Sequence, residues 1–281
     1  GISAYYHESS IFLTDGINTH CFLKEEYFTR IKGDKSFPKR SLEFLIKNYS
    51  LNEKNIKSVC FYEKPFKSWW EIFIYSIKKP LENKKLLTHH LKNFNTGSIF
   101  FYTHLNKIIK ISKDKILYSS HHLSHCLYGS LYVENVHDYA FVSCDGVGEG
   151  ETMTIYTIDT ENLIKKHWTN FYPNSIGLFY STITDFLGFD INEGEFKVMS
   201  LSSYGNPIYE KQMDQIFDCE QLKINLSYFE FQKNPERSFS EKLIEIFGKP
   251  YLNLGIKENF KKYSNIASSA QLILNKSVKN L

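Results

Sequence analysis

Long hydrophobic runs are missing from this 281-residue sequence. No stretch approaches the ~18–20 apolar residues that a membrane-spanning helix needs, and no charged segment followed by an apolar one resembles a secretory leader. We therefore expect no membrane partner and a cytoplasmic location. An initiator methionine is also missing, because Gly1 opens directly into an apolar stretch, and we expect that something upstream has been removed.

Cysteine and arginine are both scarce. The five cysteines are odd in number and far apart, which argues against a disulfide framework and favours reduced thiols in the core. Arginine occurs only at positions 30, 40 and 237. The 34 basic and 31 acidic residues are spread along the chain, so its charge does not indicate a nucleic-acid partner.

Apolar residues are abundant enough for one large or two modest cores, at 42% hydrophobic and 16% aromatic content. The first half predicts three strands ending near Leu23, of which the last two are joined by Asp15-Gly16, a two-residue hairpin signal. Helix, strand, helix, strand and helix then alternate up to about Tyr132. The helix expected in the lysine-rich, aromatic segment 64–92 has no function that we can assign.

From Asp138 the pattern begins again with three predicted strands, followed by helices from Ile176 onward. We therefore predict an α/β fold made of a duplicated unit, with residues 1–135 as the first subdomain and residues 136–281 as an incomplete second one. The strands that should complete the second copy are missing from the sequence pattern.

Candidate metal ligands lie on either side of the boundary between these halves. His121 and His125 are four residues apart, so on a helix they lie one turn apart on one face and can reach a single cation. Asp145, at the end of a predicted strand, offers a third ligand, and two nitrogens with one oxygen suit zinc or iron(II). The alternative is a pair of satisfied or surface histidines.

The stretch Asp145-Gly146-Val147-Gly148-Glu149 combines a carboxylate with glycines that would let backbone N–H groups approach a phosphate. A plain hairpin turn is the alternative. In the first half, the matching position holds His7 and Glu8, which are candidates for a general base or for holding a substrate hydroxyl. A solvated turn would explain these two residues equally well.

Two further charged segments are candidate anion sites. Arg30, Lys32 and Lys39 lie in one predicted loop, where they could bind an anionic substrate or face solvent. Glu195 and Lys197 lie beside a glycine, and a helix start with an acidic first turn would also explain the glutamate.

Six motifs resemble those of the O-carbamoyltransferases of the nodulation and antibiotic-tailoring type, in order and approximate spacing. They cover residues 1 to about 207 and read GISAYYHESS, EEYFTRIKGDKSFPK, HHLSH, CDGVGEGET, GLFYSTITDFLGF and GEFKVMSLSSYGNP. The resemblance implies an actin-like ATPase (ribonuclease-H-like) fold, akin to that of the threonylcarbamoyl-adenosine tRNA transferases. It also implies that a separate C-terminal domain, absent here, makes carbamoyl-adenylate from carbamoyl phosphate and ATP.

Carried over by position, the resemblance makes His121, His125 and Asp145 the ligands of a divalent metal, iron(II) or zinc. Contacts to carbamoyl-adenylate would come from Lys39, Asp145, Gly146, Gly148, Glu195 and Lys197, and contacts to the acceptor from His7 and Glu8. The expected acceptor is a hydroxyl of a sugar or antibiotic-like small molecule. The alternatives are a tRNA threonylcarbamoyl-transfer protein, or an inactive fragment that binds a partner chain supplying the missing half.

Overall fold

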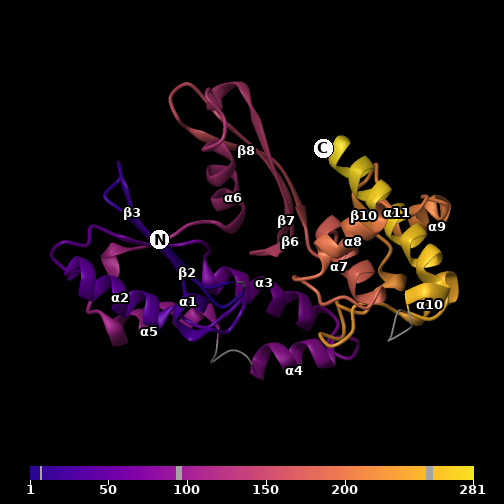
Figure 1. The fold of residues 1–281 in the computed structure, drawn as a ribbon, viewed down its shortest axis with the longest axis horizontal. Coiled ribbons are helices and arrows are strands. Elements are labelled where there is room, and N and C mark those ends of the chain that lie inside the picture. The colour runs from indigo at the N-terminus through magenta and orange to yellow at the C-terminus, as the bar shows by residue number, and fades with distance from the viewer. Residues whose placement is uncertain (7, 93–96, 251–255) are drawn as a thin grey trace. The chain divides into compact units, whose positions relative to one another are not determined.

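The computed structural model describes residues 1–6, 8–92, 97–250 and 256–281, with the side chains of residues 256–258 excepted. The chain forms two compact units (Figure 1). Unit 1 contains residues Gly1–Ile74 and His90–Ser124, and unit 2 contains Tyr75–His89 and His125–Leu281. The subdomain boundary expected near residue 135 stays a prediction.

Unit 1 is built on a five-stranded mixed sheet in the order β3-β2-β1-β4-β5. The predicted meander of β1 (Ile2–Ser3), β2 (Ser10–Thr14) and β3 (Thr19–Lys24) is confirmed, with antiparallel pairing throughout. Strand β4 (Val59–Phe61) runs parallel to β1, and β5 (Ile116–Tyr118) runs parallel to β4.

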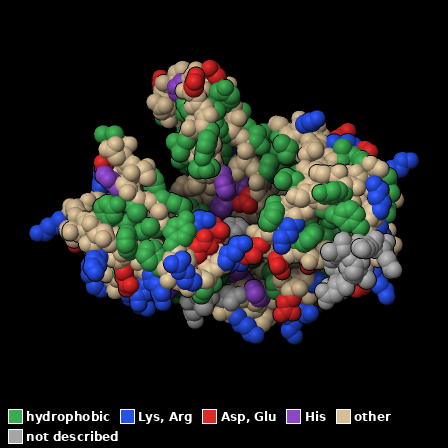
Figure 2. Space-filling view, viewed as in Figure 1, with side chains coloured by type: hydrophobic (Ala, Val, Ile, Leu, Met, Phe, Trp, Pro, Cys, Tyr) green, Lys and Arg blue, Asp and Glu red, His purple; other side chains and the backbone are tan. Residues whose placement is uncertain are grey.

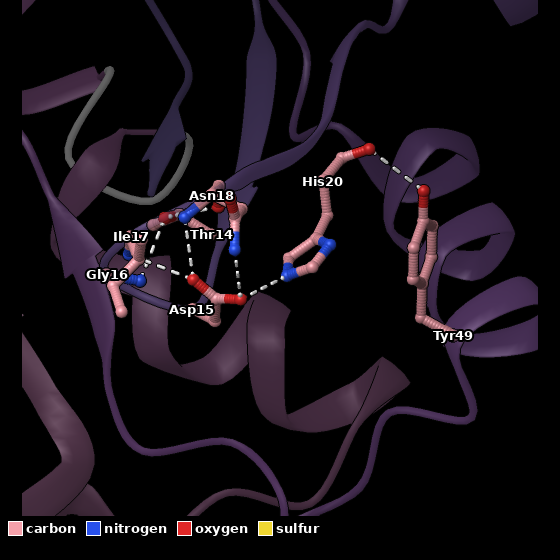
Figure 3. Close-up of polar contacts among 7 residues, drawn as sticks. All are labelled: Thr14, Asp15, Gly16, Ile17, Asn18, His20 and Tyr49. Carbon is pink, nitrogen blue, oxygen red and sulfur yellow. Dashed lines mark hydrogen bonds and ion pairs between the residues drawn. The ribbon is translucent and has the colours of Figure 1, made fainter.

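The β2–β3 hairpin differs from the two-residue turn that the Asp15-Gly16 signal predicts. Because Thr14 pairs with Thr19, the loop has four residues, 15–18. Figure 3 shows the polar contacts of this loop. The Asp15 carboxylate organises this loop: its Oδ1 accepts from the backbone N–H groups of Ile17 at 2.9 Å and Asn18 at 2.7 Å. A side chain that bonds the backbone two and three residues ahead favours an Asx-type turn over the tighter hairpin.

Helices α2 (Lys39–Tyr49) and α5 (Phe101–Ile108) of unit 1 lie where helices were predicted. Helix α1 (Glu26–Thr29) lies within the segment predicted as a loop, and the 3₁₀ turns η2 (Ser98–Phe100) and η3 (Lys113–Lys115) lie on either side of α5. Helix α2 begins where the buried Glu25 carboxylate accepts from the N–H groups of Arg40 at 2.9 Å and Ser41 at 2.8 Å. The core of this unit forms where Leu45, Phe101 and Leu105 pack near Phe61 of β4. The helical prediction for 64–92 is confirmed by α3 (Pro65–Lys78) and α4 (Lys84–Lys92).

Unit 2 contains a three-stranded antiparallel sheet of β6 (Ala140–Gly148), β7 (Glu151–Ile158) and β8 (Ile164–Phe171). The turn between β6 and β7 lies at Glu149 and Gly150, whose φ angles of 54° and 83° suit a two-residue hairpin. The glycine-rich turn that we expected to begin at Asp145 therefore starts four residues later. Residues 145–148 belong to the strand.

Helix α6 (His121–Ser130) is one continuous helix whose first turn is counted with unit 1. Unit 2 also contains α7 (Ile176–Phe186), α8 (Glu195–Ser202), α9 (Glu210–Ile216), α10 (Glu241–Phe247), α11 (Ile256–Lys279), the short strands β9 (Phe217–Asp218) and β10 (Lys223–Ile224), and the 3₁₀ turns η4 (Val136–Asp138) and η5 (Leu226–Tyr228). Helix α11 packs against α7, α8 and α9, and its buried Ile266 and Ile273 join Phe179, Ile183 and Met213 in the core.

The architecture confirms the predicted α/β class, because helices accompany a mixed sheet in unit 1 and an antiparallel sheet in unit 2. The unit 1 sheet and the β6–β8 sheet of unit 2 each contain an antiparallel meander of three consecutive strands. In the part of unit 2 that the structure describes, no parallel strands extend the β6 edge as β4 and β5 extend the β1 edge.

The structure bears on two expectations drawn from composition, one about the cysteines and one about membrane-spanning helices. All five cysteines are free, as expected, but Cys60 and Cys144 are exposed and only Cys126 is buried, so the interpretation of all five as core thiols is wrong. No helix within the described ranges is long and apolar enough to cross a membrane. Hydrophobic side chains are visible over α6 (Figure 2), and Leu127 and Tyr128 of this helix are exposed.

Candidate metal centre

The two histidines of the predicted metal site lie on α6, one helical turn apart. His121 is buried, with 9% of its surface exposed, whereas the side chain of His125 is 53% exposed. Because α6 is one continuous helix, its own geometry places both imidazoles on one face. This face of α6 is buried at His121 and open to solvent at His125.

Asp145 lies in an irregular part of β6. Cys144 pairs with Met153 and Gly148 with Glu151, so three residues of β6 stand opposite one residue of β7, which makes this stretch a bulge. The Asp145 Oδ1 atom accepts from the N–H of Gly146 at 2.6 Å. Its Oδ2 atom lies 3.7 Å from Nε2 of His125.

The structure therefore brings together the three residues predicted as metal ligands. One ligand atom from each of His121, His125 and Asp145 lies within 4.8 Å of the other two. A cation bound at about 2.0–2.2 Å from nitrogen and oxygen donors holds adjacent donors about 3–4 Å apart, and the 3.7 Å separation between His125 and Asp145 falls in that range. Two imidazoles and one carboxylate form a donor set that fits zinc or iron(II).

Helix α7 positions Asp145 through two residues that sequence reasoning did not identify. Ser175 caps this helix by accepting from the N–H of Leu178 at 3.0 Å, and its hydroxyl donates to the carbonyl oxygen of Asp145 at 2.8 Å. A Cβ atom at Gly177 would lie 2.6 Å from the Asp145 carbonyl carbon and oxygen. Only glycine permits this approach, and a serine before an apolar run was the signal available in the sequence.

Glu63 is a second residue that sequence reasoning missed. It follows β4, and its Oε2 atom lies 3.9 Å from Nδ1 of His121. The side chains of both residues are mostly buried, at 10% exposed for His121 and 12% for Glu63. A carboxylate beside a ligating histidine orients the ring and raises its basicity. The sequence held no signal for this pair, because 58 positions separate its members.

Glu8, one of the two residues proposed for the acceptor, lies in the loop between β1 and β2. Glu8 forms an ion pair with Lys24 of β3, and the Glu8 side chain is 47% exposed. His7 lies outside the described residues. The roles expected for both stay predictions.

The residues proposed for adenylate binding divide between the two units. Lys39 is the first residue of α2 in unit 1, while Gly146 and Gly148 lie in β6 of unit 2. Glu195 accepts from the hydroxyl of Ser181 at 2.7 Å and from the N–H of Asn192 at 3.0 Å, so it joins α7 to the start of α8. The ammonium of Lys197 lies 5.8 Å from the ring centre of Phe189. These contacts explain Glu195 and Lys197 structurally, and their binding roles stay predictions.

Comparisons with known proteins agree with the resemblance noted in the sequence. Residues 1–280 match the family model described as "Carbamoyltransferase N-terminus". The uncharacterized protein sll1178 of Synechocystis sp. is 30% identical over 263 residues, which cover 89% of this chain and 42% of that protein. The uncharacterized protein MJ1051 of Methanocaldococcus jannaschii is 31% identical over 185 residues, covering 65% of this chain and 28% of that protein.

A third relative carries a functional name. The nodulation protein NolNO of Sinorhizobium fredii is 23% identical over 221 residues, covering 76% of this chain and 30% of that protein. The chain thus spans less than half the length of each of these relatives. Because the family model covers nearly every residue, the chain belongs to the family of carbamoyltransferase N-terminal regions.

Proposed function

We propose that this chain is the N-terminal part of an O-carbamoyltransferase, which transfers a carbamoyl group from carbamoyl phosphate, through carbamoyl-adenylate, to a hydroxyl of a small molecule. The observation that carries the proposal is the grouping of His121, His125 and Asp145 in a chain of this family. The adenylate would be made by a C-terminal domain or partner chain that these 281 residues do not include.

We further propose that the fold is the actin-like ATPase (ribonuclease-H-like) fold, with an incomplete second copy. The support is the meander that occurs in both units. Strands β1–β3 form one antiparallel meander and strands β6–β8 form another. In unit 1, β4 pairs with β1 in parallel and so extends the sheet beyond the meander. A parallel extension after an antiparallel meander is the pattern expected of one complete copy.

The chain's own residues would hold and orient the reacting groups. His121, His125 and Asp145 would hold a divalent cation, which when bound supplies a Lewis acid for the developing charge on a carbonyl or phosphoryl oxygen. Glu63 would orient His121, and Ser175 would fix the backbone of Asp145. Lys39, Gly146, Gly148, Glu195 and Lys197 remain the candidates for contacts with the adenylate, and His7 and Glu8 those for the acceptor.

The metal site can be tested by titrating zinc, and iron(II) under anaerobic conditions, into metal-depleted protein by calorimetry. We expect His125→Ala and Asp145→Asn each to weaken affinity by at least about a hundredfold, because loss of an outer partner alone typically costs 10–100-fold. His167→Ala is the matched control, since His167 is an exposed histidine on β8 that contacts Thr157. Equal affinities of wild type and Asp145→Asn would remove the metal site from the proposal.

The reaction can be tested with a chimera in which this chain replaces the matching region of the Synechocystis relative. The assay follows radiolabel from carbamoyl phosphate, in the presence of ATP, onto a panel of sugars and aminoglycosides. We expect transfer by the chimera and by its His167→Ala variant, and loss of transfer in Asp145→Asn. Label transfer that is equally fast with Asp145→Asn would contradict the proposed role of this site.

A further inference from the structure

Unit 1 contains a cavity of about 1380 Å³ that lies entirely within this unit. Its walls come from the loop between α1 and α2, from α2 itself and from α5. The cationic side chains on these walls are Lys35, Lys39, Arg40, Lys47 and Lys107. Several Lys and Arg side chains are visible over α2 (Figure 2). None of the three candidate metal ligands on α6 and β6 lines this cavity.

The carboxylates of the cavity leave its charge positive. Among the described residues that line it, the carboxylates are Glu25 and Glu43, beside the five cationic side chains. Glu25 is buried and accepts from the N–H groups of Arg40 and Ser41 and from the Ser41 hydroxyl at 2.6 Å. Glu43 lies 3.8 Å from the ammonium of Lys39. The Glu25 carboxylate already accepts from N–H groups at the start of α2. The positive potential of the cavity therefore comes from the cationic side chains and not from the end of the helix.

One wall of the cavity is aromatic. The rings of Tyr5, Phe37 and His104 lie close together, with centres 6.2 Å apart for Tyr5 and Phe37 and 5.9 Å apart for Phe37 and His104. The Tyr5 hydroxyl and the Nδ1 atom of His104 are hydrogen-bonded at 2.6 Å. Burial, and then Lys107, lower the pKa of His104, which keeps its ring neutral near pH 7 and able to accept from Tyr5.

Tyr5 is held in a strained backbone conformation at this wall. Its φ of 80° lies in the left-handed region, which is rare for aromatic residues. The N–H of Tyr5 donates to the carbonyl oxygen of Lys35 at 2.8 Å, so the strained residue joins β1 to the cationic loop. Such strain persists mostly where surrounding contacts fix a functional geometry.

We propose that this cavity binds a small aryl phosphate. The phosphate would lie among the lysines, which are good ligands for a compact dianion, and the flat ring would pack on Tyr5 and Phe37. A purely inorganic anion would leave the aromatic wall unused, and a neutral arene would leave the cations unpaired. The inference rests on unit 1 alone and does not depend on the proposed carbamoyl transfer, although Lys39 is also a candidate contact for the adenylate.

The test is isothermal titration of phenyl phosphate into the complete chain, with inorganic phosphate and phenol as single-feature probes. We expect phenyl phosphate to bind at least about tenfold more tightly than either, because only phenyl phosphate uses both the aromatic wall and the cationic side chains. Lys35→Gln combined with Lys107→Gln should weaken phenyl phosphate about tenfold. Lys110→Gln is the matched control, an exposed lysine three residues beyond Lys107 that does not line the cavity.

Phe37→Leu separates the ring contact from the charge contact. It should reduce the preference for phenyl phosphate over inorganic phosphate about fivefold and leave the affinity for inorganic phosphate unchanged, since leucine keeps apolar volume without a flat face. Circular dichroism should verify that each variant is folded. Absence of phenyl phosphate binding, or equal binding by wild type and the double lysine variant, would overturn the proposal. Binding should be unchanged after metal depletion, so this result is independent of the α6 site.

Discussion

Replacing Gly177 with alanine should disturb the candidate metal centre without touching any of its ligands. A Cβ at this position would lie 2.6 Å from the carbonyl carbon and oxygen of Asp145 and 2.7 Å from the nitrogen of Gly146. Ordinary contact begins at 3.4 Å. The distance between α7 and β6 must therefore grow by about 0.8 Å at the backbone that carries Asp145, since backbone atoms have no alternative rotamer.

The cost to stability has two opposing parts. Overpacking of this kind typically costs about 1–3 kcal/mol, whereas alanine is favoured over glycine within a helix by about 0.5–1 kcal/mol. We therefore expect Gly177→Ala to lower the free energy of unfolding by about 1–2 kcal/mol, measured by urea denaturation. The backbone shift also exceeds the roughly 0.5 Å within which a site must be held, so zinc affinity should fall about tenfold or more.

Gly146→Ala is the matched control for this prediction. Its Cβ would meet only Cδ2 of Leu178, at 3.7 Å, which is an ordinary contact, and the change lies directly beside Asp145 in the chain. We expect its zinc affinity and stability to stay close to those of wild type. If Gly177→Ala unfolds at the wild-type urea concentration and binds zinc with wild-type affinity, then close packing of α7 does not position Asp145.

Two further predictions concern unit 1. Glu25→Ala should lower the free energy of unfolding by about 2–3 kcal/mol in urea denaturation, because it leaves the first N–H groups of α2 without their buried acceptor. The control is Glu43→Ala, which removes an exposed carboxylate and should change the free energy of unfolding by less than about 0.5 kcal/mol. Backbone N–H groups of Asn18 and Ile17 lower the pKa of the Asp15 carboxyl in the folded protein. The charged carboxylate therefore stabilises the fold above the pKa of about 3.9 that Asp has in the unfolded chain, and this stabilisation is lost as the pH falls through the lower pKa of the folded state. Acid titration followed by circular dichroism should therefore show stability falling more steeply below about pH 4 in wild type than in Asp15→Asn, and parallel curves would contradict this account.

Local periodicity was sufficient to predict most elements of the fold. Helices α2 and α7 each place apolar residues at helical spacing, and the strands of both meanders are bounded by turn residues, so their positions follow from short-range pattern. The pair His121 and His125 was predictable for the same reason, because helix geometry alone places residues four apart on one face. The sequence also indicates Asp145, as a carboxylate next to glycines, although the turn predicted to begin there begins at Glu149.

The remaining parts of the site depend on contacts between distant positions. Glu63 lies near His121 across 58 positions, and Gly177 approaches Asp145 across 32, so neither contact leaves a periodic signal. The same limit applies to the unit 1 cavity. The sequence indicated a cationic loop containing Lys39, but Lys107 of α5 and the aromatic wall join it only when α2 and α5 pack on the sheet.

The bulge in β6 connects these observations to the kind of cation that the site would hold. Because β6 carries extra residues at Asp145, the N–H of Gly146 turns toward its neighbour's carboxylate and bonds to Oδ1 at 2.6 Å. Oδ2 is the atom near His125. With one oxygen engaged by the backbone, Asp145 would bind a metal through a single oxygen. A monodentate carboxylate with two imidazoles provides few, partly soft donors, which favours zinc or iron(II) over calcium, a cation that takes six to eight oxygens.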